Sequence, residues 1–338
     1  MPAPDLVIRH SRQHMKKKHQ NIFFVFGIAV LAVMIWQLDF HQVYEGLRHA
    51  GYWFAAVIAL WALLYVLNTL TWYMIIAAGG KKRPGFWMLY KTSVSGFALN
   101  YATPGGLMGG EPYRIMELSP IIGTERASSS VILFVMTHIF SHFWFWLLSI
   151  AAYVLFYTIT PLTAGITAAA TAFCLLGLWF FTVGYRKGIA MRAAKWASHI
   201  PFAGRYATTF ITHHHDQLAV IDGQIAALHS QNRRTLVAAV LSELLCRIAS
   251  AAEIYFILLV INCDVSYTSC VIILAFTSLF ANLLFFLPMQ VGGREGGFLM
   301  SASALGMSIG SGAFLALIVR LRELVWTGIG LILIKVKK

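Results

Sequence analysis

The chain carries a glycine-rich break that ends in a glutamate, and this break occurs twice. The first copy reads Asn-Tyr-Ala-Thr-Pro-Gly-Gly-Leu-Met-Gly-Gly-Glu over residues 100–111, and the second reads Leu-Pro-Met-Gln-Val-Gly-Gly-Arg-Glu over residues 287–295. In both copies a proline stands seven positions before the glutamate, and a long apolar stretch precedes the break. Non-helical backbone at membrane depth is tolerated only where it is buried in protein or lines a polar cavity. The paired breaks therefore predict a functional site inside a membrane domain.

The composition supports a membrane protein. Of the 338 residues, 59% are hydrophobic and 12% are charged, and the mean hydropathy is +0.71. A single aqueous core cannot bury that much apolar surface. The formal net charge is +13, but the basic residues lie in short clusters between apolar stretches, so they indicate membrane topology rather than a nucleic-acid partner. We predict an all-α polytopic membrane protein.

The lengths of the apolar stretches predict about six full spans and two re-entrant hairpins. Two stretches, residues 86–103 and 267–287, lead into the breaks and are followed by pieces that are too short to cross alone. Six other stretches are long enough to cross roughly 30 Å of hydrocarbon. These six are residues 21–38, 53–78, 128–157, 162–183, 235–261 and 311–334.

The distribution of Lys and Arg predicts how the chain is threaded. By the positive-inside rule, the basic clusters, including residues 81–83 and the Lys-rich end, should face the cytoplasm. If residues 86–126 crossed once, the basic loop after residue 183 would lie outside. A hairpin over 86–126 that enters and leaves from the cytoplasm removes this conflict. The same reasoning gives a second hairpin, over 267–311, that enters from outside, as in an inverted-topology repeat.

These features divide the chain into four parts and predict a multi-pass protein of a bacterial or archaeal inner membrane with both termini in the cytoplasm. The parts are a basic N-terminus (1–20), a first half (21–183), a cytoplasmic loop with a surface helix (184–234) and a second half (235–338).

A run of three histidines and an aspartate lies in the predicted cytoplasmic loop, at residues 213–216. A metal site and a solvated face are the two interpretations. Neighbouring histidines on a helix point in different directions, which favours a solvated face, and we expect no metal site.

The breaks suit an anion site. Helices that start there would present N–H groups and the positive end of the helix dipole, and Arg114 and Arg294 would add cations. Glu111 and Glu295 would either cap these helices or bind a cationic group. Glycines allow the backbone conformations that such breaks need: Gly105, Gly106, Gly109, Gly110, Gly292 and Gly293. The alternative is that the glycines allow close helix packing and each glutamate pairs with an arginine.

Charged residues also lie inside the predicted spans. Glu243 and Arg247 are four positions apart, and Arg320 and Glu323 are three apart, which are spacings that favour an ion pair within one helix. Arg320, Arg322 and Glu323 follow the second break closely in the sequence, so we include Arg320 and Glu323 in the candidate lipid site.

Two histidines, His138 and His142, share a face of one predicted span, and Ser141 lies between them. A proton relay and hydrogen-bonded packing are the two interpretations of this pattern.

The chain resembles the transmembrane flippase domain of the lysylphosphatidylglycerol synthase family. The resemblance rests on Pro-Gly-Gly-x-x-Gly-Gly-Glu-Pro-x-Arg at residues 104–114, Pro-x-x-x-Gly-Gly-Arg-Glu-Gly at 288–296 and the Arg-rich last span. It covers nearly the whole chain and implies movement of a lipid between leaflets. It also implies that Glu111, Arg114, Arg294 and Glu295, and more weakly Arg320, form the site. We see no soluble aminoacyl-transfer domain, so we expect a stand-alone member that does not synthesise the aminoacyl lipid.

The sequence thus predicts a phospholipid translocase that needs no cofactor, since no Walker-type loop, metal-ligand cluster or nucleophile with a base is visible. Its expected partners are a membrane phospholipid, a separate lipid synthase and a second copy of the chain. Two other classes stay open. One is an intramembrane lipid-modifying enzyme with Glu111 or Glu295 as general base, and the other is a membrane scaffold.

Cysteine labelling tests the predicted threading. In a cysteine-free background, single cysteines at Lys82 and Glu125 should both react with an impermeant reagent from the cytoplasmic side, because the first hairpin returns to the side it enters from. Cysteines at Ser266 and Ser311 should both react from outside. Labelling from opposite sides within either pair would contradict the inverted hairpins.

Overall fold

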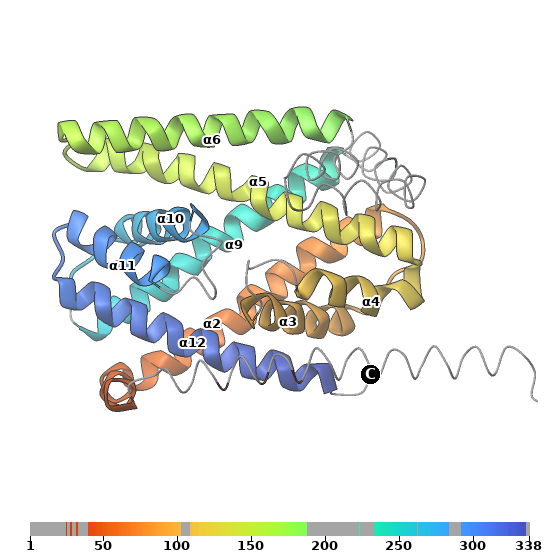
Figure 1. Ribbon diagram of the computed structural model, residues 1–338, viewed down its shortest axis with the longest axis horizontal. Helices are drawn as coiled ribbons and strands as arrows, with labels where there is room; N and C mark the ends of the chain where they lie inside the picture. The colour runs from red at the N-terminus through yellow and green to blue at the C-terminus, as the bar shows by residue number, and fades with distance from the viewer. Residues whose placement is uncertain are drawn as a thin grey trace, which may run out of the picture. The chain divides into compact units, whose positions relative to one another are not determined.

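The computed structural model describes residues 40–102, 109–187, 233–261, 263–283 and 292–335, with residues 25, 28, 32 and 223 described singly. All regular secondary structure in these ranges is α-helical (Figure 1). The helices are α2 (Phe40–Ala78), α3 (Phe86–Ala102), α4 (Gly110–Ile122), α5 (Thr124–Phe156), α6 (Pro161–Lys187), α9 (Arg233–Val260), α10 (Tyr267–Leu283), α11 (Gly293–Ala304) and α12 (Ile309–Lys335). The predicted span at 21–38 lies almost entirely outside the described residues, as does the loop that carries the three histidines.

Three helices are long and apolar enough to cross a membrane, within Val43–Ala78 of α2, Thr124–Phe156 of α5 and Pro161–Thr182 of α6. Helices α9 and α12 have 28 and 27 residues and lie where the sequence predicts spans, but both carry acidic and basic side chains along their length. The residues from Phe40 to Ala50, which lie between two predicted spans, are helical, and the helix is interrupted at Gly51, where φ is 50°.

The helices next to the two glycine breaks are short and of matching length. Helices α3 and α10 each have 17 described residues, which is about 25 Å at 1.5 Å per residue. Helices α4 and α11 have 13 and 12 residues. The same order of helices occurs twice: a long helix, two short helices and another long helix. It is formed once by α2 to α5 and once by α9 to α12.

The described chain forms two compact units. The first contains the described residues up to Tyr65, residues Trp87–Glu117 and the chain from Ala252 onward. The second contains Val66–Phe86 and Leu118–Ala251. Both breaks therefore belong to the first unit.

In the first unit, α11 packs against both α10 and α12 (Figure 1). Glycines bring these helices close together. A Cβ at Gly297 would lie 3.0 Å from the Cα of Thr277 on α10, and one at Gly312 would lie 2.9 Å from the Cα of Leu299 on α11. Helix α12 approaches α3 in the same way, since a Cβ at Gly330 would lie 2.6 Å from the carbonyl oxygen of Val94.

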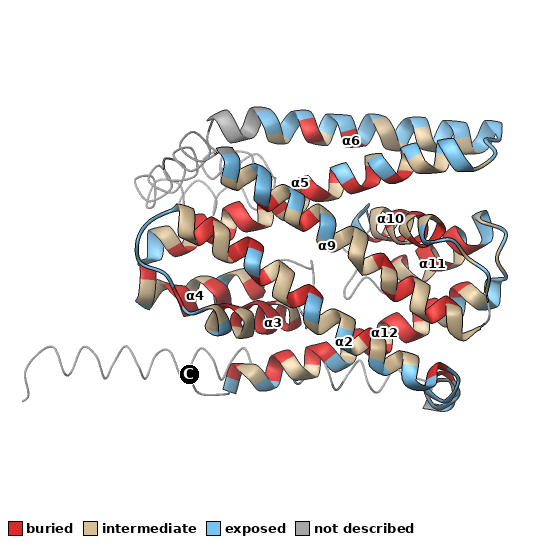
Figure 2. Ribbon diagram, turned by 180° about the vertical axis from the view of Figure 1, so that it is seen from behind, coloured by how far each residue is buried: buried red, intermediate tan, exposed pale blue. Residues whose placement is uncertain are grey.

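In the second unit, α6 packs along α5 (Figure 1). The contact is close, because a Cβ at Gly177 would lie 2.3 Å from the ring of Phe143. Most of the remaining surface of α6 is exposed (Figure 2), and it carries large apolar side chains such as Leu162, Leu176 and Trp179. An exposed apolar helix surface of this kind is suited to contact with lipid.

Candidate functional site

The second break leads into the start of α11, whose first turn is fixed by a glutamate. Gly292 precedes the helix with a φ of 81°, a conformation that glycine adopts without strain. Its N–H donates to Oε2 of Glu295 at 2.8 Å. The capping role that the sequence offered for Glu295 is therefore present. Gly293, the first residue of the helix, is buried.

Two ion pairs join the start of α11 to the middle of α12. Arg320 pairs with Oε1 of Glu295, and Arg294 pairs with Oε1 of Glu323. Arg320 and Glu323 therefore do not form the ion pair that their helix spacing allows. Instead, α11 packs against this part of α12 and supplies an opposite charge for each residue. The side chains of Arg294 and Glu295 are each 32% exposed, whereas Glu323 is 4% exposed.

A third, fully buried ion pair continues this network. Nε and Nη2 of Arg322 donate to the two oxygens of Glu253 on α9, at 2.8 and 2.9 Å. The indole N–H of Trp61 donates to Glu253 at 2.9 Å, and the guanidinium of Arg322 lies 3.9 Å from the centre of the Trp61 ring. Arg322 also lies 3.6 Å from Glu323. The charges of α12 are thus linked to one another and to α9.

Glu253 and Trp61 were not in the predicted site. A signal for Glu253 existed in the sequence, since an acid deep in an apolar stretch needs a partner to offset the cost of burial. No basic residue lies within one turn of Glu253 on its own helix. Its partner had to come from another helix, and helix spacing could not identify that helix.

The first break is organised around Asn100, at the end of α3. Its side chain accepts from the N–H of Gly110 at 2.7 Å and donates to Oε1 of Glu111 at 3.0 Å. Nη1 of Arg114 donates to the same oxygen at 3.3 Å, and Nη2 reaches the carbonyl oxygen of Ser93 at 3.5 Å. Helix α4 therefore starts against α3 with its first acid paired to an arginine one turn later.

The glycines of the first break serve packing where they are described. A Cβ at Gly110 would lie 2.2 Å from the carbonyl oxygen of Gly96, and one at Gly96 would lie 2.6 Å from Nε of Arg114. Gly109 is buried before α4 begins. Gly105 and Gly106 lie outside the described residues. Gly110 therefore allows α4 to pack closely against α3, as the packing interpretation predicts.

Two tyrosines of the first unit interact with charged residues of the breaks and of α12. Tyr65 interacts electrostatically with Arg114 and with Arg322, and Arg294 interacts with Tyr101 at the end of α3. The hydroxyls of both tyrosines and Oε2 of Glu111 are buried and have no hydrogen-bond partner among the described residues. Buried polar atoms are normally satisfied, so these three can receive a polar ligand.

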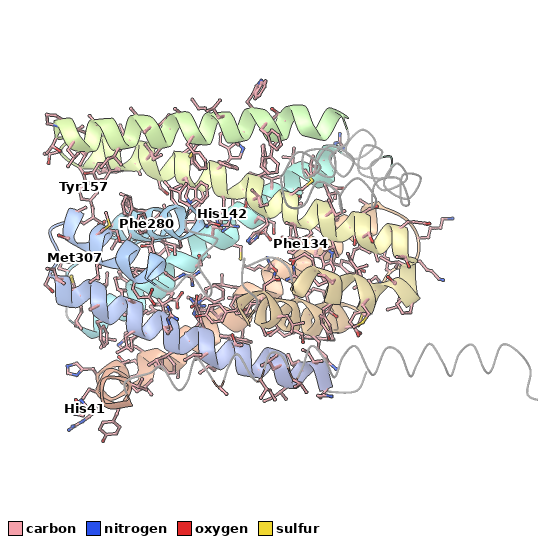
Figure 3. All side chains as sticks on the ribbon, viewed as in Figure 1. His41, Phe134, His142, Tyr157, Phe280 and Met307 are labelled. Atoms are coloured by element: carbon pink, nitrogen blue, oxygen red, sulfur yellow. The ribbon has the colours of Figure 1, made fainter. Side chains whose placement is uncertain are left out.

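A separate polar cluster lies in the second unit. Nδ1 of His138 bonds to Oε2 of Glu243 at 2.8 Å, and the side-chain amide of Asn68 donates to Oε1 at 2.9 Å. Arg247 donates to Ser141 at 3.0 Å, to the carbonyl oxygen of His138 at 3.1 Å, and to His142. Figure 3 labels His142 on α5.

Glu243 and Arg247 interact electrostatically, as their spacing predicts, but their hydrogen bonds go to other helices: Arg247 bonds to α5, and Glu243 bonds to α5 and α2. The two histidines share a face as predicted, with ring centres 5.1 Å apart.

The described residues contain no group of His, Cys, Asp and Glu side chains that could hold a metal ion. The site offers guanidinium groups, carboxylates, tyrosine hydroxyls and the N–H groups of helix starts. This set can bind a phosphate and an ammonium group by charge-assisted hydrogen bonds.

Comparison with known protein families identifies the chain. The family described as "Lysylphosphatidylglycerol synthase TM region" matches residues 23–330. The chain belongs to this family. No curated protein and no solved structure matches the chain. The match includes both breaks and nearly all of α12, so the charged network described above lies within the family's membrane region. The chain is therefore a helical membrane protein of a family linked by its name to phospholipid.

The buried pair of Glu253 and Arg322 should be structural. Glu253→Gln alone should lower the thermal midpoint in detergent by several degrees, because breaking a buried pair costs about 3–5 kcal/mol. The double variant Glu253→Gln/Arg322→Gln should regain part of this loss, since no unpaired charge remains. Glu45→Gln, at an exposed position of α2, is the control. Additive losses in the double variant would show that the two charges do not stabilise each other.

Proposed function

We propose that this protein is a phospholipid translocase that moves a charged lipid, for example an aminoacylated one, between the leaflets of the inner membrane. The observation that carries the proposal is the pair of ion pairs between the start of α11 and the middle of α12. They place two guanidinium groups and two carboxylates at the end of a short helix within an apolar chain. Membership of the family supports the proposal, since its name refers to the synthase of an aminoacylated phospholipid.

In this proposal, the two ion pairs hold the site until a lipid binds. A head group with a phosphate and an ammonium group can replace them, because the phosphate takes over the arginines and the ammonium takes over the glutamates. Arg294 and Arg320 would grip the phosphate oxygens together with the N–H groups at the start of α11. Glu295 and Glu323 would hold the cationic part. Exchanging one set of partners for another lowers the cost of bringing the head group into the membrane.

The first break would line the other side of the path along which the head group moves. Glu111 has one oxygen held by Asn100 and Arg114, and its second oxygen has no partner among the described residues. The hydroxyls of Tyr65 and Tyr101 also have no hydrogen-bond partner among the described residues. A polar head group can form hydrogen bonds with these atoms as it passes, while Arg114 balances the charge of Glu111.

The matching order of the helices around the two breaks supports an inverted repeat. Two pairs of short helices, α3 with α4 and α10 with α11, would form facing re-entrant hairpins, with both termini in the cytoplasm. About six full spans would surround them. The polar breaks would then meet inside the membrane, where irregular backbone is tolerated only along a polar path.

An intramembrane lipid-modifying enzyme is the rival function. It needs a carboxylate with an oxygen free to act as base toward the substrate. Both oxygens of Glu295 are engaged, by Gly292 and Arg320, whereas Oε2 of Glu111 has no partner among the described residues. Glu111 is therefore the carboxylate that the rival function would use. Chemical analysis of the lipid after transport distinguishes the two functions, since a translocase returns the lipid unchanged.

Lipid movement in liposomes tests the proposal. With purified protein, a head-group-labelled lipid should reach an impermeant quencher faster than in empty liposomes. Arg294→Lys keeps the charge but loses the forked donors, and Glu295→Gln loses the negative charge, so each should slow movement about tenfold or more. Arg114→Lys and Glu111→Gln should also slow it.

Glu45→Gln is the matched control, because this exposed glutamate lies outside the site and should move lipid at the wild-type rate. Wild-type rates in all four site variants, at normal protein levels, would contradict a lipid-binding role for the two breaks.

A further inference from the structure

Residues 40–50, the leading segment of α2, run in a different direction from the part of the helix that follows. The backbone at Gly51 has a φ of 50° and a ψ of −132°, which is not helical and which residues other than glycine rarely adopt. In Figures 1 and 2 the leading segment is seen end-on, whereas α12 and the following part of α2 run across the picture. Gly51 therefore turns the chain between two helical parts.

The length of α2 explains why a turn is needed. The part of α2 that is apolar enough to cross a membrane has 36 residues, Val43–Ala78, which is about 54 Å at 1.5 Å per residue. The hydrocarbon layer is only about 30 Å thick. After the turn, residues 52–78 extend over about 40 Å, which is enough to cross this layer and reach the head groups on both sides. Tyr52, the first of these residues, is 75% exposed, and tyrosine is enriched at the membrane interface.

The leading segment has three faces of different character. Gly46 and Ala50 are buried, and their spacing of four places them on one face. The opposite face is polar and carries the exposed side chain of Glu45. Tyr44 and Leu47, which are 64% and 37% exposed, lie on a flank between these two faces. A short helix with one polar and one apolar exposed side is suited to lie in the plane of the membrane interface.

The buried face of the leading segment packs on the first turns of α12, within the first unit. A Cβ at Gly46 would lie 2.7 Å from a methyl carbon of Leu317, so glycine lets the segment lie close against α12. The rings of His49 and Phe314 meet edge to face, with centres 6.5 Å apart. Arg320, which belongs to the ion pairs of the second break, follows Phe314 by about 9 Å along α12. The segment therefore lies close to the second break.

We propose that the leading segment is an interfacial helix that lies in the head-group layer of one leaflet, with Tyr44 and Leu47 toward the acyl chains. It places Arg320 about 9 Å below this layer along α12, so the second break opens toward this leaflet. The predicted threading puts Ser311 outside, which makes this the outer leaflet. The position of the helix does not depend on the proposed function. The role of this leaflet as the one that exchanges head groups with the second break rests on the proposed translocase function.

Quenching by brominated lipids tests the position of the helix. In liposomes, single cysteines at Leu47 and Glu45 of the cysteine-free protein carry a fluorescent probe. The probe at Leu47 should be quenched most by lipid brominated near the head group, because this flank faces the interface. The probe at Glu45 should be quenched by aqueous iodide. Equal quenching of both probes by iodide, or quenching at Leu47 mainly by lipid brominated at the chain ends, would overturn the interfacial helix.

Two exposed positions of α12 test the depth of the second break. Ala313 lies at the level of the leading segment, and Val325, which is 39% exposed, follows it by about 18 Å along the helix. A probe at Ala313 should be quenched most by lipid brominated near the head group, and one at Val325 by lipid brominated at the chain ends. Arg320 then lies between these depths. The same preference at both positions would overturn the depth of the second break.

Lipid movement tests the consequence for transport. The double variant Tyr44→Gln/Leu47→Gln should slow lipid movement severalfold, because polar side chains weaken the contact with the interface. Glu45→Gln places the same side chain on the polar face and should keep the wild-type rate. Gly51→Ala should also slow movement, because alanine is strained at a positive φ.

Gly165→Ala is the control for Gly51→Ala, since Gly165 is a helical glycine of α6 with no atom within 4 Å of an added Cβ. Wild-type rates in both Gly51→Ala and the double variant would overturn the role of this leaflet in transport. If wild-type protein moves no lipid, the translocase proposal fails, and the quenching measurements still decide where the leading segment lies.

Discussion

The structure depends on pairing every charge that its apolar helices bury. An isolated ionised carboxylate or guanidinium in hydrocarbon is very costly, so such groups persist only with partners. Each acid of α9 and α12 named here has a partner on another helix: Glu243 with His138, Glu253 with Arg322 and Glu323 with Arg294. These bonds fix which helices pack together and at what register. In the first unit they link the charges of α9, α11 and α12.

Close packing at glycines complements this pairing. Helix α12 contacts α11 at Gly312 and α3 at Gly330, at positions where a Cβ would overlap the neighbouring backbone. Short distances between helices bring arginine side chains within reach of acids on the facing helix. The small residues and the ion pairs therefore belong to one arrangement, in which α12 carries the charges and its glycines set the spacing.

Much of this fold can be predicted from the sequence, but the partners of the charged residues cannot. Hydropathy located the helices, and glycine and proline located the breaks, because both signals are local. Helix spacing indicated possible pairs within α9 and within α12, but it did not identify the interhelical hydrogen bonds and ion pairs that these residues form. Glu253 and Arg322 are 69 positions apart, and Trp61 and Glu253 are 192 positions apart. Contacts over such separations depend on how helices pack, which one sequence does not specify. The re-entrant threading and the lipid site remain predictions.

The central claim is that the ion pairs next to the second break are exchanged for a lipid head group. The double variant Glu295→Arg/Arg320→Glu tests it most directly. This variant keeps an ion pair between α11 and α12 but places a cation in the first turn of α11 and an anion where the phosphate would be gripped. We expect it to insert and fold at near wild-type levels and to lose lipid movement in liposomes. Lipid movement at the wild-type rate would show that this pair only joins the two helices, which would contradict the account.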